Sequence, residues 1–143
     1  MAIGALRRAG SGDEDLARRT LDAFLHAAVT AIPTGKQTSM AAQNAPSLVF
    51  AVVRDAGLWS LANAFLKPVY PSAQHDLMEA SIAHLDGYWS KLAKMYGEKG
   101  ITLRCATTLD GSEGLTNLKD THVDSLEDLI RLTLAAVKLQ PIA

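Results

Sequence analysis

The residues with the most chemical promise lie at positions 31–44, in the stretch AIPTGKQTSMAAQN. Its glycine-lysine pair prompts comparison with a nucleotide-binding P-loop, which needs G-x-x-x-x-G-K-[ST] between a strand and a helix. Here Gln37 follows Lys36 where the magnesium-binding hydroxyl belongs, and Thr30 occupies the position of the first glycine. An apolar helical pattern, rather than a strand, precedes the segment. The stretch therefore does not match a P-loop.

The charges in this part of the sequence favour a different phosphate chemistry. No acidic residue occurs between Ala31 and Val53, and Lys36 carries the only charge. A phosphodiester backbone requires a cation and several donors but no catalytic group. Successive backbone N–H groups around Gly35 can form an anion-binding nest. The neutral side-chain donors near this nest are Thr34, Gln37, Thr38, Ser39, Gln43 and Asn44. The alternative is an ordinary loop that ends a helix.

The remaining reactive residues do not form a catalytic or metal-binding motif. The four histidines are far apart in the sequence. His75 and Glu79 are four residues apart and could share a metal on one helix face, but a solvated helix start explains them better. The acids at 108–124 do not match the spacing of an EF-hand, and no Ser-His-Asp pattern stands out. We therefore expect no enzyme activity, no cofactor and no metal site.

Aromatic residues in the second half of the chain could stack on nucleic-acid bases. Trp89 and Tyr96 instead follow a helical apolar stripe, which favours a place in the core or at an interface. Tyr88 lies off that stripe and is a weaker candidate for stacking at the surface. Cys105 alternates with apolar neighbours and is best explained as a small core residue.

The composition is that of a single folded domain. The chain has 143 residues, of which 48% are hydrophobic and 20% charged, enough for a core of its own. Its net charge of -1 gives no general argument for nucleic-acid binding, so such binding must come from a local patch. One cysteine excludes an internal disulfide framework and fits a cytoplasmic location. No apolar run reaches the roughly 20 residues that cross a bilayer, so we expect no membrane association.

Hydrophobic periodicity predicts the order α-β-α-α-β-α after a flexible lead-in at residues 1–12. A continuous apolar run at Leu48–Val53 indicates a strand covered on both faces, and alternation at 101–107 indicates a half-buried strand. Two strands make a poor sheet, so pattern alone favours an α+β domain that lacks further strands. Helices are expected at 13–31, 60–68, 74–96 and from Ser125 onward, with a polar loop at 108–124.

Three blocks of sequence resemble a known family: AIPTGKQTSMAAQNAPSLVFAVVRD, LANAFLKPV and SIAHLDGYWSKLAKMYG. They look like the C-terminal part of the CasC-type backbone subunit of the type I-E CRISPR Cascade complex, in the RAMP superfamily. The resemblance implies a partial RRM- or ferredoxin-like palm at residues 13–143, without the N-terminal strand, fingers and thumb. It also implies a non-catalytic subunit of an antiviral complex, with CRISPR RNA, other Cascade subunits and copies of itself as partners.

The resemblance also assigns the RNA contact. The family's G-K/A-K-Q loop maps onto Gly35, Lys36 and Gln37, which implies that the segment Thr34–Ser39 holds the RNA backbone with Lys36 as the cation. Without the family's first palm strand, a strand at 47–54 would have an open apolar edge, which favours a homodimer or higher oligomer. The alternative function is a protein-interaction or assembly module that has lost RNA binding.

Overall fold

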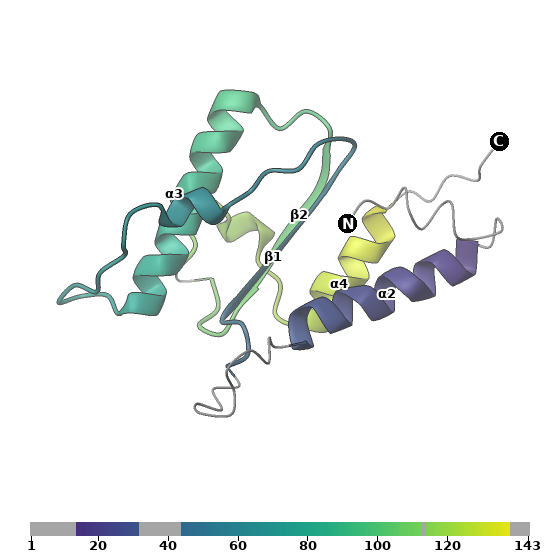
Figure 1. Ribbon diagram of the computed structural model, residues 1–143, viewed down its shortest axis with the longest axis horizontal. Coiled ribbons are helices and arrows are strands. Elements are labelled where there is room, and N and C mark those ends of the chain that lie inside the picture. The colour runs from purple at the N-terminus through teal and green to yellow at the C-terminus, as the bar shows by residue number, and fades with distance from the viewer. Residues whose placement is uncertain (1–13, 32–43, 113, 138–143) are drawn as a thin grey trace.

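The computed structural model describes residues 14–31, 44–112 and 114–137. At its centre is a two-stranded antiparallel sheet with α3 on one face and α4 with α2 on the other (Figure 1). This mixed α+β architecture confirms the predicted fold class, while the predicted lead-in at 1–12 lies outside the described residues. In chain order the elements are α2 (Glu14–Thr30), β1 (Leu48–Arg54), η1 (Ala62–Phe65), α3 (Leu77–Tyr96), β2 (Ile101–Thr108), η2 (Lys119–Thr121) and α4 (Leu126–Ala136).

Side-chain and glycine caps set both ends of the long helix α3. The carboxylate of Asp76 accepts a hydrogen bond from the backbone N–H of Glu79 at 2.8 Å, and the Glu79 side chain accepts one from the N–H of Asp76 at 3.0 Å. This reciprocal capping box starts the helix at Leu77 rather than at the predicted position 74. At the other end Gly97 adopts a φ of 72°, a conformation that a residue without a side chain reaches at low cost.

The shorter elements follow the predictions less closely. Ser125 caps α4 as expected, because its hydroxyl accepts from the N–H of Asp128 at 3.1 Å. The predicted helix at 60–68 is instead the single 3-10 turn η1. In this turn the N–H of Ala64 donates to the carbonyl of Leu61 at 3.0 Å, the i to i+3 pattern that short connecting turns commonly use.

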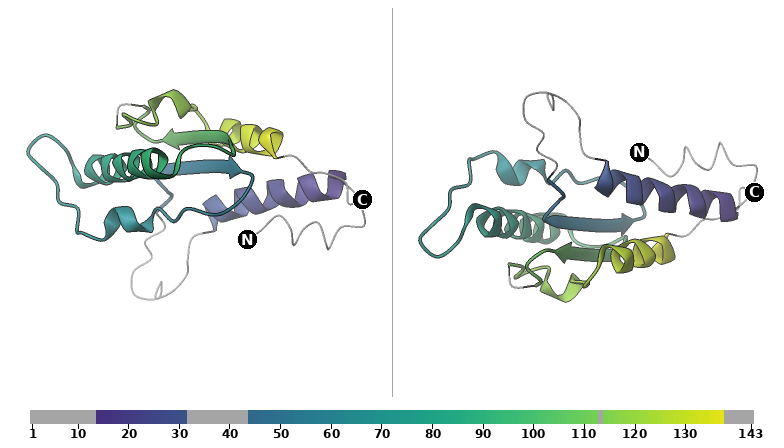
Figure 2. Two further views of the ribbon diagram at one scale, coloured as in Figure 1. Left: turned by 90° about the horizontal axis from the view of Figure 1, so that it is seen from above. Right: turned by 90° about the horizontal axis from the view of Figure 1, so that it is seen from below.

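The two strands pair in an antiparallel register that runs from Leu48 opposite Thr108 to Arg54 opposite Ile101. Side chains at alternate positions of β1 pack into two different clusters, one below α3 and one below α4. The strand is therefore covered on both faces, as its continuous apolar sequence predicts. On the β1 side of the sheet lie η1 and α2, which belong to opposite layers (Figure 2).

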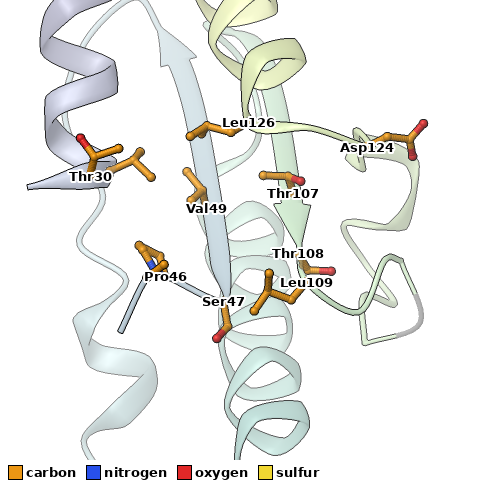
Figure 3. Close-up of a pocket in the computed structure, with 11 residues that line it drawn as sticks. Thr30, Pro46, Ser47, Val49, Thr107, Thr108, Leu109, Asp124 and Leu126 are labelled. Carbon is orange, nitrogen blue, oxygen red and sulfur yellow. The ribbon is translucent and has the colours of Figure 1, made fainter. Parts of the chain in front are cut away.

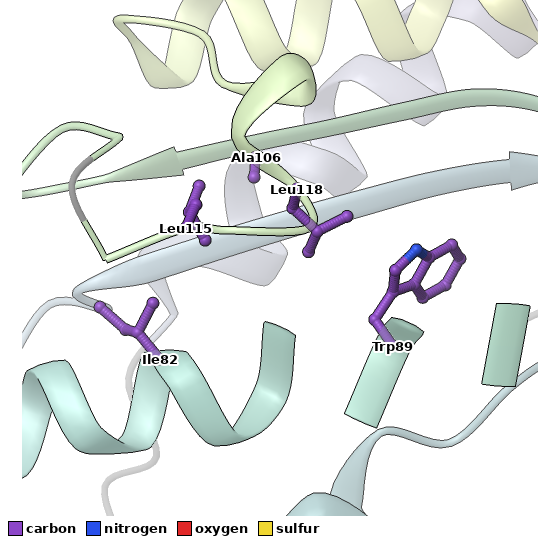
Figure 4. Close-up of a cluster of buried hydrophobic side chains, with 5 residues drawn as sticks. All are labelled: Ile82, Trp89, Ala106, Leu115 and Leu118. Atoms are coloured by element: carbon purple, nitrogen blue, oxygen red, sulfur yellow. The ribbon is translucent and has the colours of Figure 1, made fainter. Parts of the chain in front are cut away.

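The cluster below α3 contains Ile82, Trp89, Ala106, Leu115 and Leu118 (Figure 4). Two parts of it correct the sequence prediction. The stretch 108–124, expected to be a polar loop, supplies Leu115 and Leu118, which are 2% and 0% exposed. Ala106 is 0% exposed, so β2 is buried on both faces at that point rather than on one. The 108–124 stretch folds over the sheet and covers the face of β2 that the alternating sequence at 101–107 predicts to be exposed to solvent.

The second cluster, on the α4 face, is built from Cys105, Leu129 and Ile130, with Leu25 of α2 at its border. Leu25 packs against this cluster, whereas most residues of α2 are exposed. Within the described ranges, no helix is both long enough and apolar enough to cross a membrane.

Candidate functional site

The predicted RNA-contacting residues, Thr34–Ser39, lie outside the described residues. The described chain on either side of them lines one pocket of about 530 Å³ (Figure 3). Val29 and Thr30 contribute from the end of α2, and Pro46 and Ser47 contribute from the approach to β1. The chain therefore leaves α2 and enters β1 at the same pocket, although about sixteen residues of sequence separate these positions.

The walls of this pocket are apolar, with hydroxyl groups at its border. The apolar side chains include Val49, Leu109 and Leu126, and the hydroxyls belong to Thr30, Ser47, Thr107 and Thr108. Apolar walls with a few oriented polar groups are the usual lining of sites for uncharged parts of ligands. A base, a sugar or an apolar side chain would suit the pocket better than a phosphate.

The charges around the pocket support this distinction. Asp124 is the only charged residue among the described lining residues, and its carboxylate is fully exposed and points away from the pocket (Figure 3). The C-terminal end of α2, which carries the negative end of the helix dipole, has no basic residue in its last turn. Any phosphate held here therefore needs a cation from outside the described lining, and the sequence offers Lys36.

Several of the residues considered for metal binding have a side-chain partner. The Nδ1 atom of His75 lies 3.4 Å from a carboxylate oxygen of Glu79, but that carboxylate belongs to the capping box of α3. Asp120 pairs with Arg104 at 3.6 Å, and Asp124 lies 3.9 Å from His122. In the part of the chain that the structure describes, no three His, Cys, Asp or Glu side chains gather into a metal-binding group.

Cys105 is a core residue, as its alternation with apolar neighbours predicts. It is 1% exposed, and its Sγ atom lies 3.7 Å from the hydroxyl of Thr133. Burial raises the pKa of the thiol, and the hydrogen bond with Thr133 offsets part of that rise. The thiol therefore has neither the exposure nor the ionisation of a nucleophile.

The aromatic candidates fall into different environments. Trp89 is 2% exposed and packs edge-on against Phe50, with ring centroids 5.0 Å apart, so it belongs to the core. Tyr96, the last residue of α3, is 63% exposed, so of the two predicted places, core or interface, the core is excluded. Its ring centroid lies 6.0 Å from that of Trp59. Tyr88 is half-buried.

One buried polar group was missed by the sequence interpretation. Asp86, on α3, is 2% exposed and accepts hydrogen bonds from the backbone N–H groups of Asn117 and Leu118, the latter at 2.8 Å. The side-chain amide of Asn117 donates to the same carboxylate at 2.6 Å. The signal in the sequence is an acidic residue four positions after Ile82 and three before Trp89, on the apolar face of the helix. Its role is to fasten the 115–118 loop to α3.

A family model described as "CT1975-like protein" matches residues 1–132 of the chain. The chain belongs to the CT1975-like family. Two solved chains share its fold at 30% sequence identity over 88% of its length. One, described as "CRISPR RNA-guided surveillance complex", superposes with a TM-score of 0.71. The other, described as "CRISPR RNA-guided surveillance complex, pre-nicking", gives 0.73.

The CT1975-like chain spans 46% of the first of these chains and 33% of the second. The shared fold therefore covers nearly all of this chain but less than half of either of the others. A comparison with curated proteins gives no match. The family match includes the residues of the predicted RNA-contacting segment, although the structure does not describe them.

Proposed function

We propose that this chain is a non-catalytic, CasC-type subunit of a type I-E CRISPR surveillance complex that holds the phosphate backbone of CRISPR RNA in the cytoplasm. The observation that carries the proposal is the likeness to two chains of RNA-guided surveillance complexes, at 30% identity over 88% of this chain. Family membership over residues 1–132 supports it. On this proposal the domain is part of an RRM-like palm.

The segment Thr34–Ser39 is the proposed contact with the RNA backbone. Its support is the stretch from Ala31 to Val53, in which Lys36 is the only charge. The described residues that flank this segment line a pocket without a cation among its lining residues, so on this proposal the phosphate contact depends on Lys36. The apolar wall of that pocket would receive the uncharged part of a nucleotide.

Binding of single-stranded CRISPR repeat RNA across a salt series tests the role of Lys36. Each phosphate contact on a single strand contributes about 0.7 to the slope of log K against log salt. The change Lys36→Ala should therefore flatten the slope by about 0.7. The matched control is Lys91→Ala, because Lys91 is exposed on α3, across the sheet from the pocket, and should leave the slope unchanged.

A neutral variant separates charge from hydrogen bonding in the same assay. Thr38→Ala removes a hydroxyl donor but no charge, so it should weaken binding about 2- to 10-fold with an unchanged salt slope. Equal slopes for the wild type and Lys36→Ala would contradict the assignment of Lys36. If the wild type does not bind RNA at all, the alternative stands, namely an assembly module that has lost RNA binding.

The non-catalytic part of the proposal has its own test. Repeat RNA labelled at one end should remain intact after prolonged incubation with the chain and Mg²⁺ or Mn²⁺. Cleavage that co-purifies with the chain and is abolished by substitution of one of its described polar residues would refute it.

A further inference from the structure

The last residue of β1 is an arginine whose charged group lacks a counter-charge. The guanidinium carbon of Arg54 lies 4.4 Å from the centroid of the Trp59 ring, a cation–π contact. Its Nε and Nη1 atoms are buried and form no hydrogen bond, and no carboxylate in the described ranges pairs with them. Burying a charge without a counter-charge costs free energy. An anionic group supplied by another molecule would recover part of that cost.

Trp59 joins this arginine to a cluster of aromatic side chains. Its ring centroid lies 5.2 Å from that of Trp89 and 6.0 Å from that of Tyr96. Trp89 is buried, whereas Tyr96 is 63% exposed and Leu58, next to Trp59 in the chain, is 89% exposed. The arginine therefore lies between the core and an exposed apolar surface, at the end of the molecule where β1 and α3 both terminate (Figure 1).

We call the group Arg54, Leu58, Trp59 and Tyr96 the Arg54 surface. Arginine, tryptophan and tyrosine are the residue types most enriched among the energetically dominant contacts of protein interfaces. Folding has already removed water from two nitrogens of the guanidinium, so a carboxylate that binds it incurs less of the usual desolvation cost. Nη2 is not among the buried nitrogens without a partner. It is therefore the position open to that carboxylate.

The charges at this end of the molecule favour a protein over a nucleic acid as the ligand. The two chain segments that meet here, 54–59 and 97–100, together carry two cations and two carboxylates. A nucleic-acid backbone binds through an excess of cations, one for each phosphate that is neutralised, and these segments have no such excess. A protein segment needs only one carboxylate for Arg54 and an apolar side chain for the exposed apolar residues beside it.

We infer that the Arg54 surface binds a segment of another protein that presents a carboxylate next to an apolar side chain. The carboxylate pairs with Nη2 of Arg54, and the apolar side chain packs against Leu58 and Tyr96. β1 has seven residues, so about 20 Å separates this surface from the pocket at the start of the strand. The inference therefore concerns a surface apart from the proposed RNA contact, and it holds whether or not the chain binds RNA.

Selection of short random peptides on the folded chain, with the Arg54→Gln variant as competitor, tests the inference. Enriched peptides should carry Asp or Glu next to an apolar residue and should bind Arg54→Gln about 10- to 100-fold more weakly. Replacing the peptide's carboxylate by an amide should cause a similar loss. Tryptophan fluorescence reports binding, because the chain has two tryptophans and both belong to this cluster. The matched control is Arg131→Gln, which changes an exposed arginine of α4 and should leave the affinity unchanged.

The variant Arg54→Met separates a binding role from a structural one. Methionine removes the buried charge and keeps an apolar stem beside Trp59, so the urea midpoint of the free chain should stay the same or rise. The same variant should lose affinity for the selected peptides. If Arg54 served only to hold Trp59 in place, the midpoint of Arg54→Met would fall and peptide binding would not depend on a carboxylate.

Four results would overturn the inference. They are a selection that enriches no peptide, enriched peptides without a carboxylate, equal affinity of a selected peptide for the wild type and Arg54→Gln, and a urea midpoint that falls in Arg54→Met. Single-stranded oligouridine provides a further probe. Quenching of tryptophan fluorescence by oligouridine that Arg54→Gln abolishes would assign the surface to nucleic acid instead.

Discussion

The strongest structural prediction concerns the buried carboxylate of Asp86. Its oxygens accept from the backbone N–H of Asn117 at 3.0 and 3.1 Å and from that of Leu118 at 2.8 Å. The Asn117 side-chain amide adds a contact at 2.6 Å. Replacing Asp86 by alanine removes every one of these acceptors and leaves a space beneath the 115–118 loop. We expect this substitution to be among the most destabilising in the described chain.

The size of the effect follows from the environment of the three donors. Asn117 is exposed, so its side-chain amide regains hydrogen bonds with water and contributes little to the loss. Leu118 is 0% exposed, and its N–H would be left without a partner. Two backbone hydrogen bonds to a carboxylate, at about 1.5–2 kcal/mol each, give about 3–4 kcal/mol. That is a large part of the roughly 5–15 kcal/mol that typically stabilises a domain.

Urea unfolding measures this loss, with tryptophan fluorescence as the signal because Trp89 is buried beside the loop. All variants are compared at one protein concentration, so that self-association does not alter the comparison. Asp110→Ala is the control, since Asp110 is exposed and has no described hydrogen bond or ion pair. Asp86→Asn keeps the shape but turns one acceptor into a donor, and it should lose about 2 kcal/mol. A loss below about 1 kcal/mol for Asp86→Ala would refute the assigned role of this carboxylate.

Two further predictions concern titrating groups. Burial raises the pKa of the Cys105 thiol, so just above pH 9 only the unfolded chain releases this proton. The free energy of unfolding should therefore decrease as pH rises through this range. Cys105→Ala should remove this decrease. The same burial should make the native thiol react with a disulfide reagent far more slowly than the urea-unfolded chain, and equal rates would contradict it. The hydrogen bonds of Asp128 with Arg131 and then Ser125 lower the pKa of its carboxyl. The stability that this carboxylate contributes is therefore present above about pH 4 and lost as pH falls through the lowered value, and Asp128→Asn should show less acid dependence in unfolding between about pH 5 and pH 2.

The predictions from sequence were most accurate for local structure. The four-and-three spacing of apolar residues placed α3, Gly97 marked its end, and Ser125 marked the start of α4, because caps and periodicity depend on neighbouring residues alone. The start of α3 was misplaced, since the reciprocal bonds between Asp76 and Glu79 exclude the residues before them from the helix. The helical turn η1 was predicted too long.

The candidate site could be predicted only in part. The absence of acids around Lys36, which favours a phosphate contact, is a property of the sequence, as are the residues Gln37 and Thr30 that do not match a P-loop. The arrangement of Val29, Ser47 and Thr107 around one pocket is not, because these residues come from three parts of the chain whose packing brings them together. The lack of a described cation in that pocket, which makes Lys36 the residue to test, likewise emerged only from the fold.

The sequence by itself determined the approximate positions of α2, β1, α3, β2 and α4 and that β1 needs cover on both faces, since these properties follow from the order of apolar and capping residues. Tertiary structure decided what provides that cover and what remains open. It buried Asp86 beneath a loop that reads as polar, and it left Tyr96 exposed although its spacing matches the core. Among the described residues, it gave β1 one neighbouring strand, β2. Such outcomes depend on contacts between residues distant in the chain, and local sequence patterns do not encode which distant partners will meet.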